Sequence, residues 1–180
     1  MAEKAQQQPA PDGSVVLGID PGLRVTGYGL IVQSNADLKV LDYGVFAVDA
    51  RLPLPERFRR LFDSLQELIA RHAPAEVAIE QPFFAVNVRS AMAIGEARAL
   101  AVLAAGIAGL PVHQYSPAAI KQSVTGYGRG SKGQVQEMVR LQLGLAEAPE
   151  PADAADALAT ALCHIIRQRA RRLLQERAQP

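Results

Sequence analysis

Two carboxylates stand at the ends of short apolar runs, where they could bind a metal ion or another ligand. Asp20 follows the run 15–19 and precedes a Pro-Gly turn, and Glu80 closes the run 77–79. Acidic residues are rare in strands and costly to bury, so these positions indicate contact with water, a cation or a ligand. Two alternatives stay open: Asp20 could cap the turn through its own backbone, and Glu80 could be an exposed loop acid.

A second pair of acids begins the last predicted helix. Asp153 and Asp156 are three residues apart and therefore share one helical face near the first turn. Acids at this position could simply complement the helix macrodipole. The small residues Ala154, Ala155 and Ala157 favour a site instead, because they let the helix pack closely against the sheet edge that carries the other two acids.

The four acids together would suit a hard divalent cation. Two unshielded carboxylates in close contact repel each other, so one takes up a proton unless a cation neutralises them. Oxygen ligands are the ones that Mg²⁺ and Mn²⁺ prefer. His164 lies two turns beyond the helical acids, and we expect it at the surface or behind the ligands, not among them.

Aromatic and basic residues near these acids could contact nucleic acid. Phe83 and Phe84 follow Glu80 closely enough to stack on a base, with burial in the core as the alternative. Three cations, Lys121, Arg129 and Lys132, lie in or beside a glycine-rich stretch that leads to a helix N-terminus suited to phosphate. A solvated helix face is the alternative for such cations. The stretch lacks the residue order of a nucleotide P-loop, which weighs against an NTPase.

Hydrophobic patterns predict the elements that must position these side chains. Three strands, 15–19, 28–33 and 40–48, are joined by short connections and should form an antiparallel meander. An amphipathic helix over 58–72 leads to a fourth strand, 77–80. A strand, a helix and another strand favour a right-handed crossover, which makes the fourth strand parallel to the first.

Parallel neighbours end at the same edge of a sheet, so Asp20 and Glu80 should lie side by side. The rest of the chain predicts more helices and one further strand, which completes an α/β fold. These elements are a helix over 89–106, a strand over 111–115, a helix from Ser116 through Lys121, a helix opened by a capping box of Ser131 and Gln134, and a helix after Pro151.

Composition predicts one soluble domain. The chain has 180 residues, 49% of them hydrophobic, and a net charge of +1 that leaves its class of partner open. We expect a disordered tail over 1–13, a domain over 14–168 and a basic tail over 169–180. The start has no signal-peptide core, and the single Cys163 fits packing in a reducing cytoplasm, so we expect a cytoplasmic protein without a membrane segment. The helix over 89–106 is apolar on several sides and is a candidate subunit contact.

Five segments resemble the RuvC family of Holliday-junction resolvases. They are G-I-D-P-G-L-R-V-T-G-Y-G, I-E-Q-P-F-F-A-V-N, Y-S-P-A-A-I-K-Q, G-S-K-G-Q-V-Q and D-A-A-D-A-L-A, in family order over about residues 15–164. The resemblance implies an RNase H-like domain with a five-stranded mixed sheet, the first three strands antiparallel. It also implies a homodimer that makes paired, symmetric, Mg²⁺-dependent cuts in four-way DNA junctions during recombination and repair.

The resemblance also assigns roles to residues. It places the catalytic, metal-binding acids at Asp20, Glu80, Asp153 and Asp156, with two Mg²⁺ ions for which Mn²⁺ may substitute. It places DNA contacts at Phe83, Lys121 and Lys132, to which the local patterns add Phe84 and Arg129. Some members have His where this chain has Asp153, which leaves the role of that position open. The RuvA and RuvB branch-migration proteins are the partners it implies.

Two other functions fit parts of the pattern. Another RNase H-like nuclease, of the RNA-processing type that resembles YqgF, would cut linear RNA in preference to four-way DNA. A structure-specific DNA-binding protein without catalysis would have lost one of the acids, and all four are present in this sequence.

Overall fold

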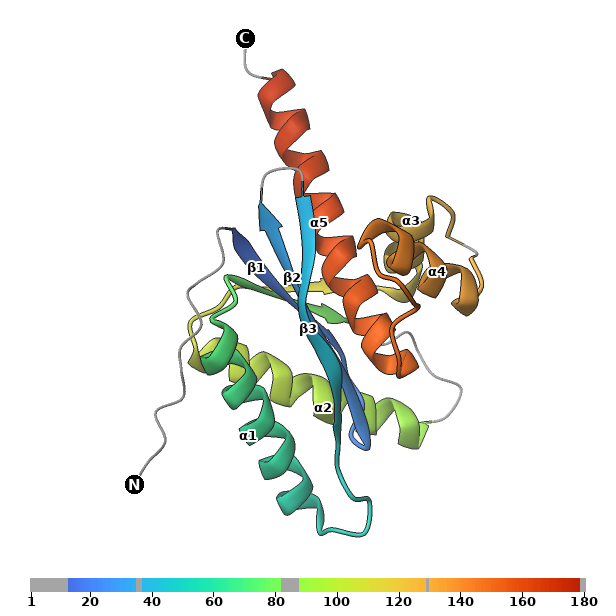
Figure 1. Ribbon diagram of the computed structural model, residues 1–180. Helices are drawn as coiled ribbons and strands as arrows, with labels where there is room; N and C mark the ends of the chain where they lie inside the picture. The colour runs from blue at the N-terminus through green and yellow to red at the C-terminus, as the bar shows by residue number, and fades with distance from the viewer. Residues whose placement is uncertain (1–12, 35–36, 82–87, 129, 179–180) are drawn as a thin grey trace.

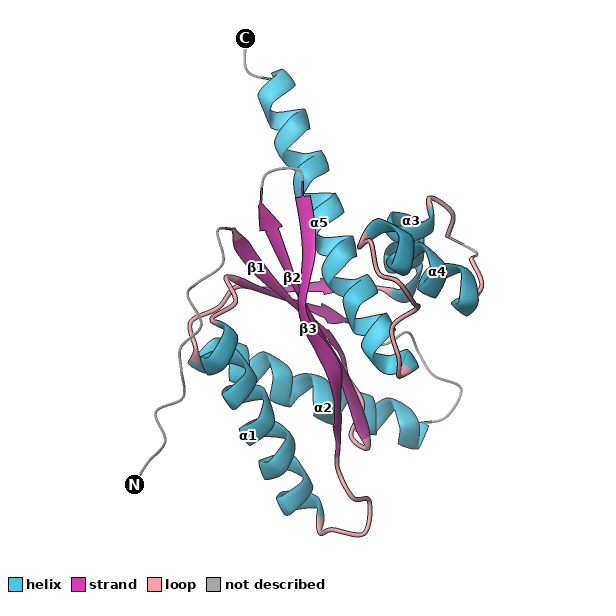
Figure 2. Ribbon diagram, in the orientation of Figure 1, coloured by secondary structure: helices cyan, strands magenta, loops and turns pink. Residues whose placement is uncertain are grey.

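A five-stranded mixed sheet with helices on both faces forms the protein, as the computed structural model shows (Figures 1 and 2). The structure describes residues 13–34, 37–81, 88–128 and 130–178. The strands lie in the order β3-β2-β1-β4-β5. Their bounds are β1 Ser14–Asp20, β2 Val25–Ser34, β3 Asp37–Ala47, β4 Glu76–Glu80 and β5 Val112–Tyr115.

Strand directions agree with the sequence prediction. β1 pairs antiparallel with β2, and β2 pairs antiparallel with β3. β1 pairs parallel with β4, with Ile19 opposite Ile79. Asp20 and Glu80, each one residue further along, therefore end adjacent strands at the same edge of the sheet. The predicted antiparallel meander and crossover are confirmed.

Alternating side chains divide the interior into two cores. On one face, Val15, Leu17 and Ile19 pack with α1 (Leu54–His72) and α2 (Val88–Ile107). On the other face, Val16 and Ala78 pack with α3 (Pro117–Thr125), α4 (Lys132–Gln142) and α5 (Ala152–Ala178). By this alternation Asp20, Glu80 and Glu76 belong to the α5 face.

Glycines in β1 and β2 let α5 lie directly against the sheet. A Cβ atom at Gly18 would meet the carbonyl oxygen of Ala157, and one at Gly29 would lie 2.7 Å from Leu158 Cγ. The glycine face of β1 and β2 is thus covered by α5. Its stripe of Leu158, Leu162 and Ile165 is fully buried.

Several element boundaries differ from the sequence predictions. α3 continues to Thr125, four residues past the predicted end at Lys121, and the Thr125 hydroxyl donates a hydrogen bond to the Lys121 carbonyl one turn back. α1 begins at Leu54, before the predicted start at residue 58, because the proline in its first turn favours a helix start. α5 is continuous to Ala178, with residues 170–177 exposed, over the range expected to be a basic tail. Residues 1–12 of the expected N-terminal tail lie outside the described residues.

Candidate active site

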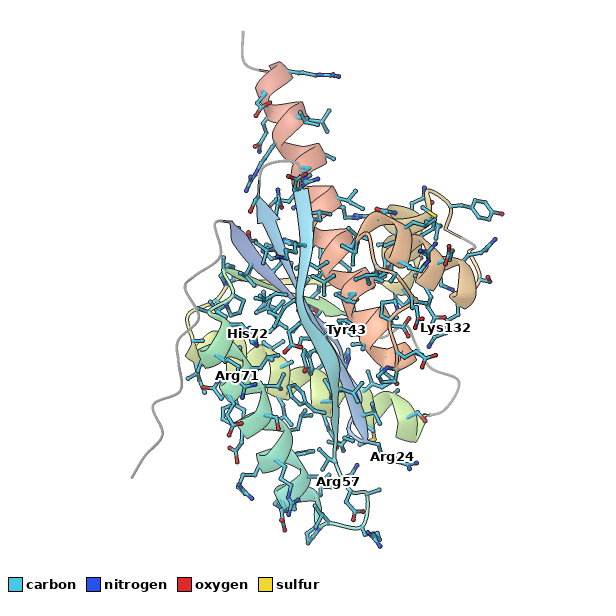
Figure 3. The ribbon with its side chains drawn as sticks, viewed as in Figure 1. Arg24, Tyr43, Arg57, Arg71, His72 and Lys132 are labelled. Atoms are coloured by element: carbon cyan, nitrogen blue, oxygen red, sulfur yellow. The ribbon has the colours of Figure 1, made fainter. Side chains whose placement is uncertain are left out.

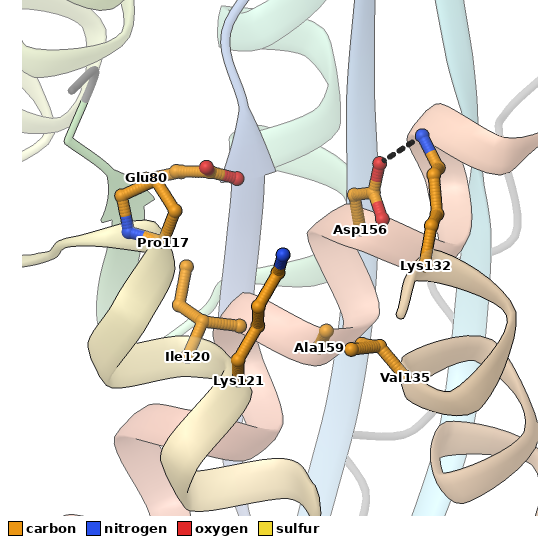
Figure 4. Close-up of a pocket in the computed structure, with 8 residues that line it drawn as sticks. All are labelled: Glu80, Pro117, Ile120, Lys121, Lys132, Val135, Asp156 and Ala159. Atoms are coloured by element: carbon orange, nitrogen blue, oxygen red, sulfur yellow. Dashed lines mark ion pairs between the residues drawn. The ribbon is translucent and has the colours of Figure 1, made fainter. Parts of the chain in front are cut away.

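Three elements bring carboxylates together at the C-terminal ends of β1 and β4. Glu80 and Asp156 line a cavity of ≈ 250 Å³ between β4, α3, α4 and α5 (Figure 4). Lys121 and Lys132 line the same cavity, whose apolar wall includes Ile120 and Val135. The cavity therefore combines two carboxylates and two ammonium groups beside an apolar wall.

The glycine face of β2 also positions the start of α5 beside Asp20. Asp20 lies opposite Gly27 in the β1–β2 register. A Cβ at Gly27 would meet the carbonyl oxygen of Asp153, so the first turn of α5 lies directly over this glycine. The small residues Ala154 and Ala157 are fully buried, as close packing of the helix requires. The predicted role of small residues in this helix is confirmed.

Burial and repulsion from neighbouring acids raise the pKa values of Asp20 and Glu80. Burial, with smaller contributions from Glu80, Asp156 and Asp153, raises the pKa of Asp20 to about 7, against the opposing charge of Lys132. Burial and the charge of Asp156 likewise raise the pKa of Glu80 to about 7. Asp20 interacts with all three other acids and is therefore electrostatically the centre of the group.

Two lysines compensate part of this negative charge. Lys132 Nζ lies 2.8 Å from Asp156 Oδ2, and its side chain remains 60% exposed (Figures 3 and 4). The hydrogen bond to Asp156 raises the pKa of Lys132. Lys132 is the first residue of α4, which opens with the predicted capping box: Ser131 accepts from the Gln134 amide, and Gln134 Oε1 accepts from the Ser131 amide. Lys121 reaches the same cavity from α3.

The donor set fits a hard divalent cation. The side-chain donors at the centre are carboxylate oxygens, which Mg²⁺ and Mn²⁺ prefer. Burial and, to a smaller extent, the neighbouring acids raise the pKa values of Asp20 and Glu80, and the two lysines offset this only in part. A bound cation would offset the remaining negative charge and keep both groups ionised at neutral pH.

The remaining predicted residues have different outcomes. Phe83, Phe84 and Arg129 lie outside the described residues. His164 is not at the surface: it is 2% exposed, and its Nδ1 lies 2.8 Å from the Tyr115 hydroxyl. Of the two places expected for His164, the surface is excluded, because α5 turns this face toward β4 and β5, where His164 Nε2 lies 3.2 Å from Glu76.

Two residues that were not predicted as site residues, Glu76 and His113, accompany His164. His113 Nε2 lies 2.8 Å from Glu76 Oε2. A usable signal was present, because Glu76 is separated from Glu80, and His113 from Tyr115, by even spacings that place them on the α5 face. To predict the whole group from sequence, one would also need the register of β5 and the position of α5 against β4.

Residues 16–164 match the family described as "Crossover junction endodeoxyribonuclease RuvC". A protein of that description from Chloroflexus aurantiacus is 49% identical over 148 residues, which are 82% of this chain and 90% of the relative. Another from Dehalococcoides mccartyi is 51% identical over 149 residues, 83% of this chain and 89% of the relative.

Solved structures agree with the sequence relatives. The structure described as "T. thermophilus RuvC in complex with Holliday junction substrate" is 38% identical, with a TM-score of 0.83. The matched region covers 87% of this chain and 96% of that one. A second structure of Thermus thermophilus RuvC is 37% identical, with a TM-score of 0.80 over the same shares of the two chains.

Proposed function

The chain belongs to the RuvC family of crossover junction endodeoxyribonucleases, and from this premise we propose that it resolves four-way (Holliday) DNA junctions at the Asp20 site. It has the RNase H-like fold of the Thermus thermophilus structure. The observation that carries the proposal is the cavity in which Glu80 and Asp156 face Lys121 and Lys132, inside the matched range.

We assign metal binding to Asp20, Glu80, Asp153 and Asp156. Nucleases of this family depend on metal, and the hard oxygen donors favour Mg²⁺, with Mn²⁺ as a substitute. Two ions bound here would activate a water molecule and neutralise charge on the leaving 3′ oxygen. Asp20 interacts with each of the other acids, so we expect it to be the carboxylate shared between ions.

We assign the two cavity lysines to the DNA backbone. Lys132 is ion-paired with Asp156 while its side chain stays largely exposed, and Lys121 approaches from the next helix. Bound cations would neutralise the carboxylates, and Lys132, whose side chain is largely exposed, could then bind a phosphate in place of Asp156. Phe83, Phe84 and Arg129 follow or adjoin these positions in sequence, and we keep them as proposed DNA contacts.

A homodimer would give the paired cuts. α2 carries several exposed apolar side chains, namely Val88, Met92, Leu103 and Ile107. Its stretch Ser90–Ile107 is long and apolar enough to cross a membrane by length and composition alone. We propose that this surface instead contacts a second copy, since a two-fold dimer matches a two-fold junction. A cytoplasmic setting with RuvA and RuvB as partners is the corresponding proposal for the cell.

Cleavage of a synthetic four-way junction in Mg²⁺ tests the proposal. Asp20→Asn, Glu80→Gln and Asp156→Asn should abolish cutting and keep junction binding, because each removes a ligand charge and none removes a phosphate contact. A matched control is Asp63→Asn, an exposed acid paired with Arg59 on α1, which should cut at the original rate.

The outcomes discriminate among the functions. Retained turnover in Glu80→Gln would contradict the assignment of this site. Preferential cutting of linear RNA would favour the RNA-processing nuclease, and junction binding without cutting under any metal would favour a non-catalytic DNA-binding protein.

A further inference from the structure

A second group of possible metal ligands lies on the same face of the sheet, at the other end of β4. Glu76 begins β4, His113 is the second residue of β5, and His164 belongs to α5. One donor atom from each residue lies within 4.8 Å of the other two. Glu76 and Glu80 are four positions apart along β4, or about 13 Å, so this group is distinct from the acidic site.

The contacts within the group are short but poorly aligned for hydrogen bonding. Glu76 Oε2 lies 2.8 Å from His113 Nε2 and 3.2 Å from His164 Nε2. Among the residues that the structure describes, both Nε2 atoms are nevertheless buried without a hydrogen-bond partner of acceptable geometry. The two ring nitrogens therefore lie within contact distance of one carboxylate oxygen without a hydrogen bond to it, so all three atoms could serve as ligands of one ion.

Neighbouring groups fix each donor from behind. The Tyr115 hydroxyl lies 2.8 Å from His164 Nδ1, which leaves Nε2 as the free donor of that ring. Gln168 donates a 2.7 Å hydrogen bond to Glu76 Oε1, which leaves Oε2 toward the histidines. Metal-binding imidazoles and carboxylates in proteins are held in the same way by outer hydrogen bonds.

The protonation states also suit a cation. Burial and the charge of His113 lower the pKa of His164, so this imidazole is neutral at pH 7. Burial alone would raise the pKa of Glu76, but the Gln168 hydrogen bond and the two imidazoles together hold it below its usual value. Neutral imidazole and ionised carboxylate are the forms that bind metal.

We propose that Glu76, His113 and His164 bind one Zn²⁺ ion, or a similar borderline transition-metal ion, with an open fourth position. Zn²⁺ binds imidazole nitrogen and carboxylate oxygen at about 2.0 to 2.2 Å in a tetrahedron, which sets donors about 3.3 Å apart. One donor separation, 3.2 Å, is already near this value, and the other, 2.8 Å, would have to widen by about 0.5 Å. The side chain of His113 is 32% exposed although its Nε2 atom is buried, so this residue is the one of the three nearest to solvent.

Such an ion would join three elements that carry the acidic site. β4 and α5 supply Glu80 and Asp156 at their other ends, and β5 leads directly into α3. Zn²⁺ bound at Glu76 and His164 would therefore fix the position of α5 along the sheet. Its role is structural support of the acidic site, and its binding can be measured without DNA or cleavage.

Direct titration of metal-stripped protein tests the proposal. Zn²⁺ would be titrated against a chromophoric chelator in excess Mg²⁺, which occupies the acidic site. One equivalent should bind, raise the thermal midpoint, and shift the imidazole NMR signals of His113 and His164 but not of His72. The chain has one other histidine, His72, which provides an internal control. Its Nε2 lies 3.5 Å from a single carboxylate, Asp42.

Variants separate metal binding from a merely hydrogen-bonded cluster. His113→Gln and Glu76→Gln should weaken Zn²⁺ binding by more than about 100-fold, because each removes a ligand. Tyr115→Phe should weaken it by about 10- to 100-fold, because it removes only the group that orients His164. The control His72→Gln should bind like the original protein.

Two results would overturn the proposal. One is the absence of Zn²⁺ uptake by the original protein under these conditions. The other is equal affinity in the original protein and in both His113→Gln and Glu76→Gln, which would place any bound ion elsewhere. Because no readout depends on junction cutting, failure here leaves the proposed nuclease function unaffected.

Discussion

Replacing Asp20 by Asn should stabilise the metal-free protein at alkaline pH, although it removes a ligand. Asp20 is buried beside three other acids, and its pKa is raised from the usual 3.8 to about 7. An unfolded chain releases this proton near 3.8, whereas the folded chain keeps it until near 7. The folded state therefore binds more protons over this range, and the free energy of unfolding falls as pH rises through it.

The magnitude follows from the same values. A tenfold difference in proton affinity corresponds to about 1.4 kcal/mol, so a rise from 3.8 to about 7 corresponds to about 4 kcal/mol once Asp20 is ionised. Roughly 2 to 3 kcal/mol of this loss falls between about pH 5 and pH 8. The raised pKa of Glu80 lowers the free energy of unfolding by a similar amount. The two contributions cannot simply be added, because the acids titrate as one coupled group.

Urea unfolding followed by circular dichroism, in chelator, measures the effect. The original protein should lose stability from about pH 5 to pH 8, and Asp20→Asn should lose less and be more stable by about 2 to 4 kcal/mol at the higher pH. Mg²⁺ should stabilise the original protein and have a smaller effect on the variant. If the free energy of unfolding fell equally in the two proteins over this pH range, the argument that Asp20 is a buried acid with a raised pKa would be refuted.

Three further predictions address the helix contact and the DNA contacts. Gly29→Ala should destabilise the protein by about 1 to 3 kcal/mol in urea unfolding, because its Cβ would meet Leu158, whereas Gly133→Ala, with open space around it, should not. Lys121→Ala should weaken junction binding and reduce the slope of log affinity against log salt by about one, and an unchanged slope would place this lysine away from DNA. Phe83→Ala should slow cutting of intact junctions, and unpaired bases at the junction centre should restore the rate if Phe83 acts by stacking.

The sheet and its edge could be predicted from sequence because local signals agree with the tertiary arrangement. Short apolar runs that end in Asp20 and Glu80, separated by an amphipathic helix, favour one arrangement of parallel neighbours, and the structure has it. Element ends were less predictable, since they depend on particular contacts. Thr125 illustrates this, because its hydroxyl donates to the Lys121 carbonyl one turn back, in the part of α3 past the predicted end.

The acidic group could be predicted from the sequence, whereas the histidine cluster could not. Asp153 and Asp156 are close in sequence, and the alanines beside them show which helix face must approach the sheet. The residues Glu76, His113 and His164 are isolated in sequence, and only the alignment of two strands with one helix brings them together. Even spacings place Glu76 and His113 on the α5 face of their strands, but no local pattern brings the three residues together.

One feature of the sequence explains how both groups arise from the same helix. Gly18, Gly27 and Gly29 remove side chains from the α5 face of β1 and β2, so that α5 can approach the sheet backbone. A helix held this closely places Asp153 and Asp156 over the strand ends and, two turns on, His164 over the start of β4. The glycines therefore determine the geometry of the acidic site as directly as the acids do, although none of them carries a functional group.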